Sequence, residues 1–257
     1  MRLNSFTKTL LLILLLNLSH SVFSQKPDST KIVRHFDGVL TVTNKGISSI
    51  PNLTLGKPAA IIYLSMGGKF RFEPEFRLAL EGKPWMFIFW ARHDFLNTDK
   101  FFVKARTNVT VVFNTITVTT DNIPDNVLKA SRTLTSDLVA NYRLTKNISI
   151  GPYYMYIYGI EKYAIKNIHF IALRTGFSNI KLSEQFYMGF SPQVYFLKMD
   201  KDHGYYFNST LTLARKNFPL SFSSLFSKTI HTEIPVGENL LWNVSLVYTF
   251  NNSYVKK

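Results

Sequence analysis

The chain has 257 residues, no Cys, 15% aromatic residues against 18% charged ones, and a formal net charge of +14. The absence of Cys excludes a disulfide framework, a lipoprotein anchor and a thiolate metal site. The positive charge would suit a nucleic-acid surface, but no basic cluster with interleaved stacking aromatics occurs, so we expect no nucleic-acid partner and favour anionic lipids or solutes.

The N-terminus has the anatomy of a secretory signal peptide. A basic start with Arg2 and Lys8 leads into a Leu-rich run that is too short for a membrane-spanning helix. Val22 and Ser24 hold the positions that a signal peptidase reads. The sequence therefore predicts a signal peptide over 1–24, cleaved near Ser24, and one mature domain over 25–257. An N-terminal membrane anchor is the alternative.

The stretch 69–95 contains two strand-like runs joined by a turn at 81–84. In the first run, apolar residues such as Phe72 and Phe76 alternate with Arg71, Glu73, Glu75 and Arg77. Successive side chains of a strand point to opposite faces, so one face is apolar and the other is charged.

The same alternation recurs to the C-terminus, with almost no helical segment to cover the apolar faces. We expect strands near 38–45, 58–66, 69–80, 85–95, 101–119, 127–144, 148–160, 167–177, 185–199, 205–216, 219–230 and 239–251. A closed barrel satisfies every backbone group and turns its apolar face to lipid. The pattern therefore predicts an all-β fold, a transmembrane antiparallel up-and-down β-barrel of about twelve strands with both ends periplasmic. A soluble secreted β-sandwich is the alternative.

The connections alternate in length. Short turns at 67–68, 145–147 and 217–218 are expected at the periplasmic end, and longer loops at 47–56, 161–166 and 231–238 at the outer end.

The last strand carries a family resemblance. Trp242, Val244, Leu246, Tyr248 and Phe250 share one face. This strand resembles the C-terminal targeting strand of Gram-negative outer-membrane β-barrel proteins, although here residues 251–257 follow the final aromatic residue. The aromatic richness and the signal ending also look like Bacteroidetes-type barrels. The resemblance implies an outer-membrane location, with outer-membrane lipids and the barrel-insertion machinery as partners.

The polar phase of each strand gives the candidate lumen residues. The charged ones are Arg71, Glu73, Glu75, Arg77, Arg92, Asp94, Lys104, Arg106, Asp137, Arg143 and Arg174, and the amides are Asn108, Asn114, Asn141, Gln193 and Asn208. A charge facing lipid at mid-depth costs about 2–4 kcal/mol, so these side chains should point inward.

Arg outnumbers carboxylate in this set, which favours a narrow channel or binding barrel for small solutes, anionic ones above all. The alternative is that the charges pair across strands and plug a structural or surface-interaction barrel.

A lipid-active enzyme is a further hypothesis, because outer-membrane phospholipase A and the lipid A deacylases are barrels. Those families place His and Ser two residues apart on one strand. None of His35, His93, His169, His203 and His231 has Ser at that spacing. No nucleophile elbow, metal-binding His pair or phosphate loop occurs either. We therefore expect no enzyme activity, no cofactor and no metal site.

Overall fold

The computed structural model describes residues 33–120, 123–235 and 237–255. The expected signal peptide over 1–24 lies outside these residues. Residues 34–254 form one unit, and the fold reported below is that of this unit. No helix among the described residues is long and apolar enough to cross a membrane, a finding that bears on helices alone.

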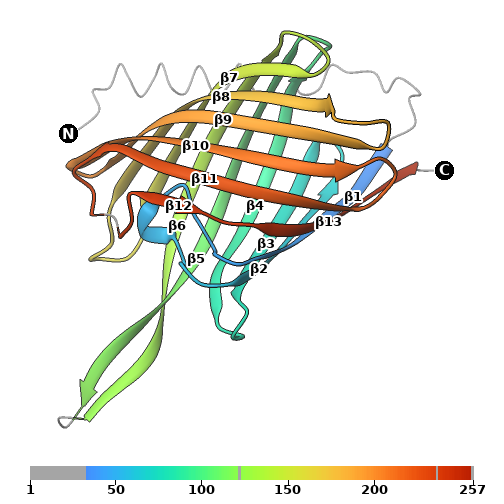
Figure 1. Ribbon diagram of the computed structural model, residues 1–257. Coiled ribbons are helices and arrows are strands. Elements are labelled where there is room, and N and C mark those ends of the chain that lie inside the picture. The colour runs from blue at the N-terminus through green and yellow to red at the C-terminus, as the bar shows by residue number, and fades with distance from the viewer. Residues whose placement is uncertain (1–32, 121–122, 236, 256–257) are drawn as a thin grey trace, which may run out of the picture. The chain divides into compact units, whose positions relative to one another are not determined.

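The unit is an antiparallel sheet closed into a barrel (Figure 1). Its elements are β1 (Val33–Thr43), η1 (Pro51–Leu53), β2 (Ala59–Gly67), β3 (Phe70–Ala79), β4 (Pro84–Asn97), β5 (Phe101–Thr120), β6 (Ile123–Arg143), β7 (Ile148–Gly159), β8 (Asn167–Lys181), β9 (Phe186–Met199), β10 (Asp202–Arg215), β11 (Leu220–Thr232), β12 (Leu240–Trp242) and β13 (Ser245–Val255). Each strand from β1 to β11 pairs with the next one, β13 lies between β11 and β1, and this closes the sheet.

The last strand is divided. β12 and β13 both pair with β11, so they are two parts of one strand and the barrel has twelve strands. The expected uninterrupted strand over 239–251 is wrong at 243–244, because side chains replace the ladder there. The Leu225 amide donates to the side-chain oxygen of Asn243 at 2.9 Å, and the Val244 amide donates to that of Asn44 at 2.8 Å. The expected all-β barrel and the other strand positions are confirmed.

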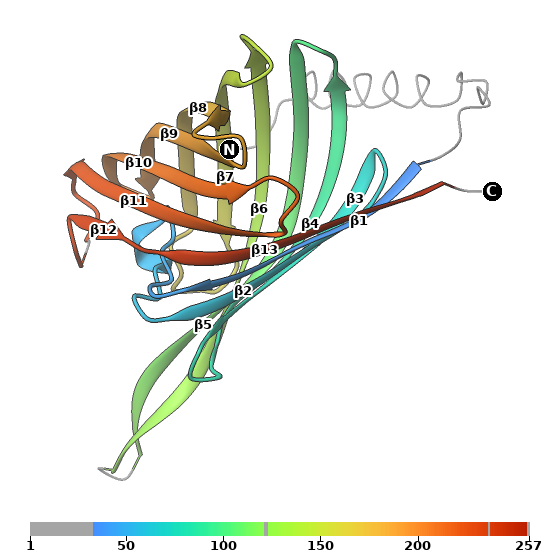
Figure 2. The ribbon, with the colours of Figure 1, turned by 45° about the vertical axis from the view of Figure 1, so that its right-hand side comes forward.

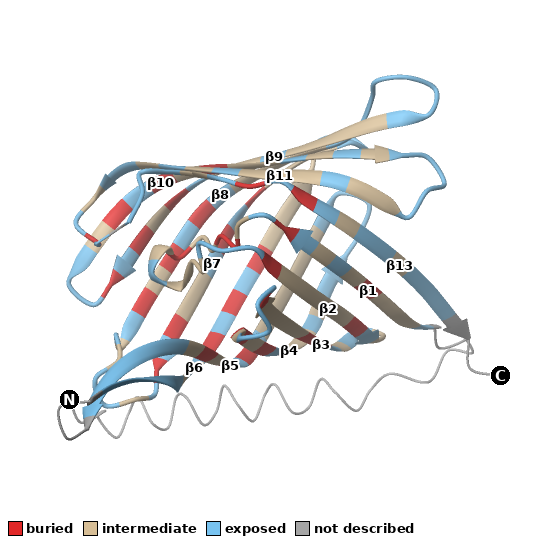
Figure 3. Ribbon diagram, turned by 60° about the horizontal axis from the view of Figure 1, so that its bottom comes forward, coloured by how far each residue is buried: buried red, intermediate tan, exposed pale blue. Residues whose placement is uncertain are grey.

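Buried and exposed positions alternate along the strands (Figure 3), and the outward face is apolar. Its exposed large side chains include Leu40, Phe72, Phe89, Val109, Leu138, Ile171, Leu173, Val194, Leu211, Phe222 and Leu246. Soluble proteins rarely expose so continuous an apolar surface, whereas a lipid-facing barrel requires one. The exposed apolar side chains, which alternate along each strand with inward-facing ones, therefore identify a transmembrane barrel and not a soluble sandwich.

The barrel has two ends. The terminal end is where β1 begins and β13 ends, and the loop end is the opposite one. Residues 44–58, here called the inward loop, connect β1 to β2 at the loop end and fold into the barrel, with η1 inside the ring of strands (Figure 2). The longer loop expected at 47–56 is present at the same end as those at 161–166 and 231–238, but the sequence did not predict that it folds inward.

The inward loop turns inward because it carries apolar residues at three-residue spacing. Ile47 and Ile50 are buried, and Ile50 packs in an apolar cluster with Phe170 and Leu197. Leu53 packs against that cluster and against the one around Trp85. Transfer of these side chains from water to the barrel interior favours the inward position.

β5 and β6 continue past the barrel rim. β4 pairs with β5 only as far as Val112, and β7 pairs with β6 only from Thr133. Residues 113–120 and 123–132 thus project from the loop end as a hairpin, here called the free hairpin (Figures 1 and 2). The sequence predicted strands longer than a membrane crossing at this point, and the structure has them.

Candidate functional site: the barrel lumen

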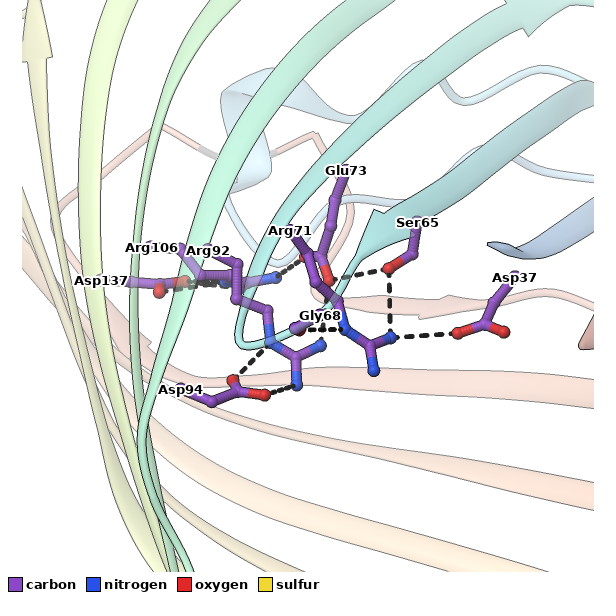
Figure 4. Close-up of polar contacts among 9 residues, drawn as sticks. All are labelled: Asp37, Ser65, Gly68, Arg71, Glu73, Arg92, Asp94, Arg106 and Asp137. Atoms are coloured by element: carbon purple, nitrogen blue, oxygen red, sulfur yellow. Dashed lines mark hydrogen bonds and ion pairs between the residues drawn. The ribbon is translucent and has the colours of Figure 1, made fainter. Parts of the chain in front are cut away.

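Strands β1 to β6 bring most of the predicted lumen charges onto one wall. Their polar phase points inward because the apolar phase occupies the lipid face. On β3 and β4, the Glu73 carboxylate is fully buried and accepts from Arg92 at 3.0 Å. The same guanidinium binds both oxygens of Asp94, at 2.7 and 2.8 Å (Figure 4).

Arg106 on β5 and Asp137 on β6 form the second centre of this wall. The Arg106 Nε lies 3.1 and 3.0 Å from the two carboxylate oxygens of Asp137. The Tyr153 hydroxyl donates to the same carboxylate at 2.9 Å, and the Arg106 guanidinium lies 4.1 Å from the centre of the Trp90 ring. Arg106 also approaches Glu73 at 3.9 Å, which links the two centres.

Two further pairs extend the wall. Arg71 donates to Asp37 at 3.0 Å, and Arg77 donates to Glu75 at 2.5 Å. Asp37 was missed at the sequence level, because the first strand was expected to start at residue 38. It lies one residue before that boundary, in the inward phase of β1, opposite Ser65.

Charges on this wall cancel. The cations are Arg71, Arg77, Arg92, Lys104 and Arg106, and the carboxylates are Asp37, Glu73, Glu75, Asp94 and Asp137. The excess of Arg expected from the sequence is therefore absent here once Asp37 is included. The alternative that the charges satisfy one another describes this wall well.

Arg174 lies on β8, two strands beyond β6, and differs from the arginines of the paired wall. Among the described residues, no carboxylate oxygen lies within 4.0 Å of a nitrogen of its guanidinium, which is the limit for an ion pair. Its Nε donates to the Gln193 side chain at 3.0 Å, and its guanidinium lies 3.5 Å from the centre of the Tyr153 ring. Arg174 is thus held by neutral groups and keeps its positive charge uncompensated.

Arg174 lines two lumen cavities, of about 300 Å³ and 370 Å³. The first lies beneath the inward loop and also touches the paired wall at Arg77 and Arg106. The second is polar and is lined by Asn141, Gln193 and Asn208 together with Ser and Thr hydroxyls. Both cavities include Ser49 of the inward loop, so Arg174 and Ser49 mark the place where they adjoin.

The remaining predicted lumen residues have other surroundings. Lys104 forms no ion pair within the described chain, and its ammonium lies 5.7 Å from the Phe102 ring centre. Arg143 donates to the Thr98 carbonyl and to the Asn97 side chain, so it holds the turn at the terminal end. Asn108 is buried, and Asn114 belongs to the free hairpin.

The inward loop is anchored by side chains that sequence reasoning did not single out. The Tyr195 hydroxyl donates to the Ser49 carbonyl at 3.0 Å, and the Trp85 indole donates to the Leu53 carbonyl at 2.9 Å. Tyr195 stands between Phe170 and Tyr206, with ring centres 4.6 and 5.0 Å away. These rings lie in the inward phase, where only polar residues were expected, so the loop half of the lumen is largely apolar.

No metal or complete catalytic group is assembled in the described residues. They contain no cluster of three His, Asp or Glu side chains that could hold a metal ion. His35 Nδ1 lies 3.1 Å from the Ser253 hydroxyl, at an exposed position of the terminal end. A base–nucleophile pair needs a third group to orient the base, and no hydrogen bond to the other ring nitrogen of His35 is present in this part of the chain.

No protein-family model and no curated protein sequence matches the chain. Solved structures do resemble it. A KdgM porin in complex with disordered oligogalacturonate aligns with a TM-score of 0.51 and 8% identity, over 84% of this chain and 99% of the porin. An outer membrane channel from Pseudomonas putida F1 aligns with a TM-score of 0.52 and 11% identity, over 88% of this chain and 100% of the channel. The chain therefore has the fold of Gram-negative outer-membrane β-barrels, which supports an outer-membrane location.

Proposed function

We propose that this protein is a narrow outer-membrane channel or binding barrel for small anionic solutes, with Arg174 as the selecting cation. The observation that carries this proposal is the position of Arg174, uncompensated by any described carboxylate and exposed to both lumen cavities. The cations and carboxylates of the paired wall are equal in number, so Arg174 gives a positive charge to the two cavities that it lines.

The surroundings of Arg174 suit a transient anion. Its side chain is held through Nε and through the Tyr153 ring, which leaves terminal N–H groups free to donate to a carboxylate or phosphate oxygen. Asn141, Gln193 and Asn208 offer neutral hydrogen bonds beside it. A single cation among neutral donors attracts an anion without holding it permanently, as conduction requires.

A KdgM porin has been solved with oligogalacturonate, a carboxylate-bearing solute, so a barrel of this fold can accommodate anions. At 8% identity the likeness concerns the fold, and the proposal for this chain rests on its own Arg174.

The test compares ion preference in planar bilayers under a salt gradient. Arg174→Gln should lower the anion-to-cation permeability ratio several-fold, because it removes the uncompensated charge and keeps a hydrogen-bond donor. The matched control is the double variant Glu75→Gln/Arg77→Gln, which removes one paired cation and its carboxylate and should leave the preference unchanged. An unchanged preference in Arg174→Gln would contradict the proposal.

A plugged structural or surface-interaction barrel is the second candidate, because the inward loop fills the loop half of the lumen. A folded barrel that gives no conductance steps under any tested voltage would favour it. We propose no enzymatic role; lipid hydrolysis by the purified protein that is lost in Ser253→Ala would overturn that view.

A further inference from the structure

Basic side chains on the outer surface of the barrel are unevenly distributed at the loop end. Lys198 on β9 is exposed, and its neighbours in the strand, Leu197 and Met199, are buried inside the barrel at 0% and 4% exposure. Lys198 therefore points outward, toward lipid. A lysine on this face is costly unless an anionic group lies beside it or its ammonium reaches the interface.

Register places other basic residues next to Lys198. His169 on β8 and His203 on β10 are its direct partners on either side. Directly opposite residues of neighbouring strands have Cβ atoms about 4.5–5.5 Å apart, so these three side chains form one row. On β11, His231 pairs with Tyr205 and Lys228 pairs with Phe207. We call His169, Lys198, His203, Lys228 and His231 the rim patch.

The other strands carry one basic residue at the same level, Arg132 on β6, which lies opposite Val111 and is paired with Glu161 at 3.0 Å. The other outward positions near the loop end are Val42 on β1, Ala60 on β2, Leu78 on β3, Phe87 on β4, Val111 on β5 and Tyr158 on β7. General attraction of lysines to both membrane surfaces would scatter basic residues around the circumference. Their concentration on four consecutive strands, β8 to β11, indicates a local ligand.

The patch is built as an amphiphile site. The ring centre of Phe196 lies 5.9 Å from that of His203 and 5.2 Å from that of Tyr205. The Tyr154 hydroxyl lies 2.9 Å from Nδ1 of His169. Toward the barrel middle the same face continues with the exposed apolar residues Ile171 and Val194. The hydrogen-bond donors of the rim patch thus adjoin an apolar surface that the acyl chains of a lipid would cover.

The carboxylates near the rim patch do not neutralise its two lysines, Lys198 and Lys228, within the described chain. Glu233 pairs with His203 at 2.7 Å, and Asp200 accepts the backbone amides of Lys166 and Asn167 at 3.0 and 2.9 Å. Asp202 lies at the start of β10, opposite Met199, and forms no ion pair with a described residue. Lys198 and Lys228 form no ion pair with any described residue.

We propose that the rim patch binds the phosphate group of membrane lipids in the leaflet at the loop end, with the acyl chains lying along β8–β11. The negative charge of a phosphate group complements the two lysines. Its oxygens can accept hydrogen bonds from the Tyr and His side chains. This inference is independent of solute passage through the lumen.

The test uses native mass spectrometry of the full folded barrel in detergent, titrated with dioleoylphosphatidylglycerol. Dioleoylglycerol, which lacks the phosphate, and inorganic phosphate, which lacks the acyl chains, are the comparison probes. Phosphatidylglycerol should bind clearly more tightly than either one. Lys198→Gln/Lys228→Gln should weaken its binding roughly tenfold, since each lysine near an anionic surface contributes a few-fold.

The matched control is Lys57→Gln/Lys83→Gln, which removes two loop-end lysines from the opposite side of the barrel and should retain wild-type lipid binding. Heat-modifiable gel migration checks that each variant is folded, and the single variants serve if the double one is not. Equal loss in both double variants, no loss in the rim-patch variant, or equally tight binding of dioleoylglycerol or inorganic phosphate would each overturn the proposal.

Discussion

Arginines inside this barrel differ in what surrounds them, and that difference separates structure from function. Arg106 is bound by Asp137 and lies against Trp90, so its charge is satisfied by the protein. Arg174 has an amide and a ring as neighbours and remains available to a solute. The same residue type, in the same phase of the alternation, thus has two roles that depend on whether a carboxylate lies opposite.

Removal of one member of the buried pair should be strongly destabilising. Asp137→Asn leaves Arg106 with a neutral partner in a buried setting, and breaking a buried ion pair costs about 3–5 kcal/mol. Urea unfolding of the barrel refolded in vesicles would measure the loss. Glu161→Gln, which removes the exposed partner of Arg132, is the control and should have little effect. A wild-type unfolding midpoint for Asp137→Asn would contradict the assigned role of this pair.

Asp200, in the turn between β9 and β10, predicts a pH effect. Hydrogen bonds from the backbone amides of Lys166 and Asn167 lower the pKa of its carboxyl group. A lowered folded-state pKa adds stability that is complete above the unfolded value, near 3.9, and is lost as pH falls through the folded value.

Asp200→Asn should therefore lose less stability than the wild-type protein between pH 7 and pH 3. Asn suits the substitution because it tolerates the positive φ of 52° at this position. Denaturant unfolding at both pH values would test it, and equal pH dependence in the two proteins would argue against a contribution from Asp200.

At the scale of elements, the inward loop decides how wide the lumen is. Its two ends lie close together, because the Gly46 amide donates to the Lys57 carbonyl at 2.8 Å and the Leu55 amide to the Gly46 carbonyl at 3.0 Å. The residues between them can therefore be removed without separating β1 from β2.

Replacement of residues 47–56 by two glycines should raise single-channel conductance several-fold, because it clears the loop half of the lumen. The anion preference should persist, since Arg174 is retained. Deletion of 115–126 from the free hairpin is the control and should leave conductance unchanged, because that segment lies beyond the barrel rim. If the loop deletion leaves conductance unchanged, the inward loop does not limit passage.

Strands were predictable here because lipid outside and a polar interior impose an alternation of period two on each of them. Even the excess length of β5 and β6 was visible in the sequence. The inward loop was not predicted, because a loop leaves no periodic trace and its few apolar residues, Ile47, Ile50 and Leu53, resemble those of an exposed loop. Their three-residue spacing beside Pro51 was the available signal.

The candidate site was predictable in part. Phase assignment placed Arg174 and Gln193 correctly in the inward phase of β8 and β9, but pairing depends on which strands face one another across the lumen. Asp37 on β1 and the stacked rings of Tyr195 and Tyr206 could be related to the other lumen residues only once the barrel was closed.

For the whole molecule, charge is arranged by surface. The five cations and five carboxylates of the paired wall cancel, Arg174 adds a positive charge to the lumen, and the rim patch leaves one sector of the outer surface positive. The net charge of the chain, +14, therefore gives little information about the lumen by itself. Function follows from the few cations that the fold leaves uncompensated.

The most direct test of this account is the reversal potential of single wild-type channels in planar bilayers under a salt gradient. The account predicts small, stable conductance steps with a reversal potential of the sign given by anion preference. Steps with cation preference, or a folded barrel that stays silent even after the inward loop is removed, would contradict a lumen governed by Arg174.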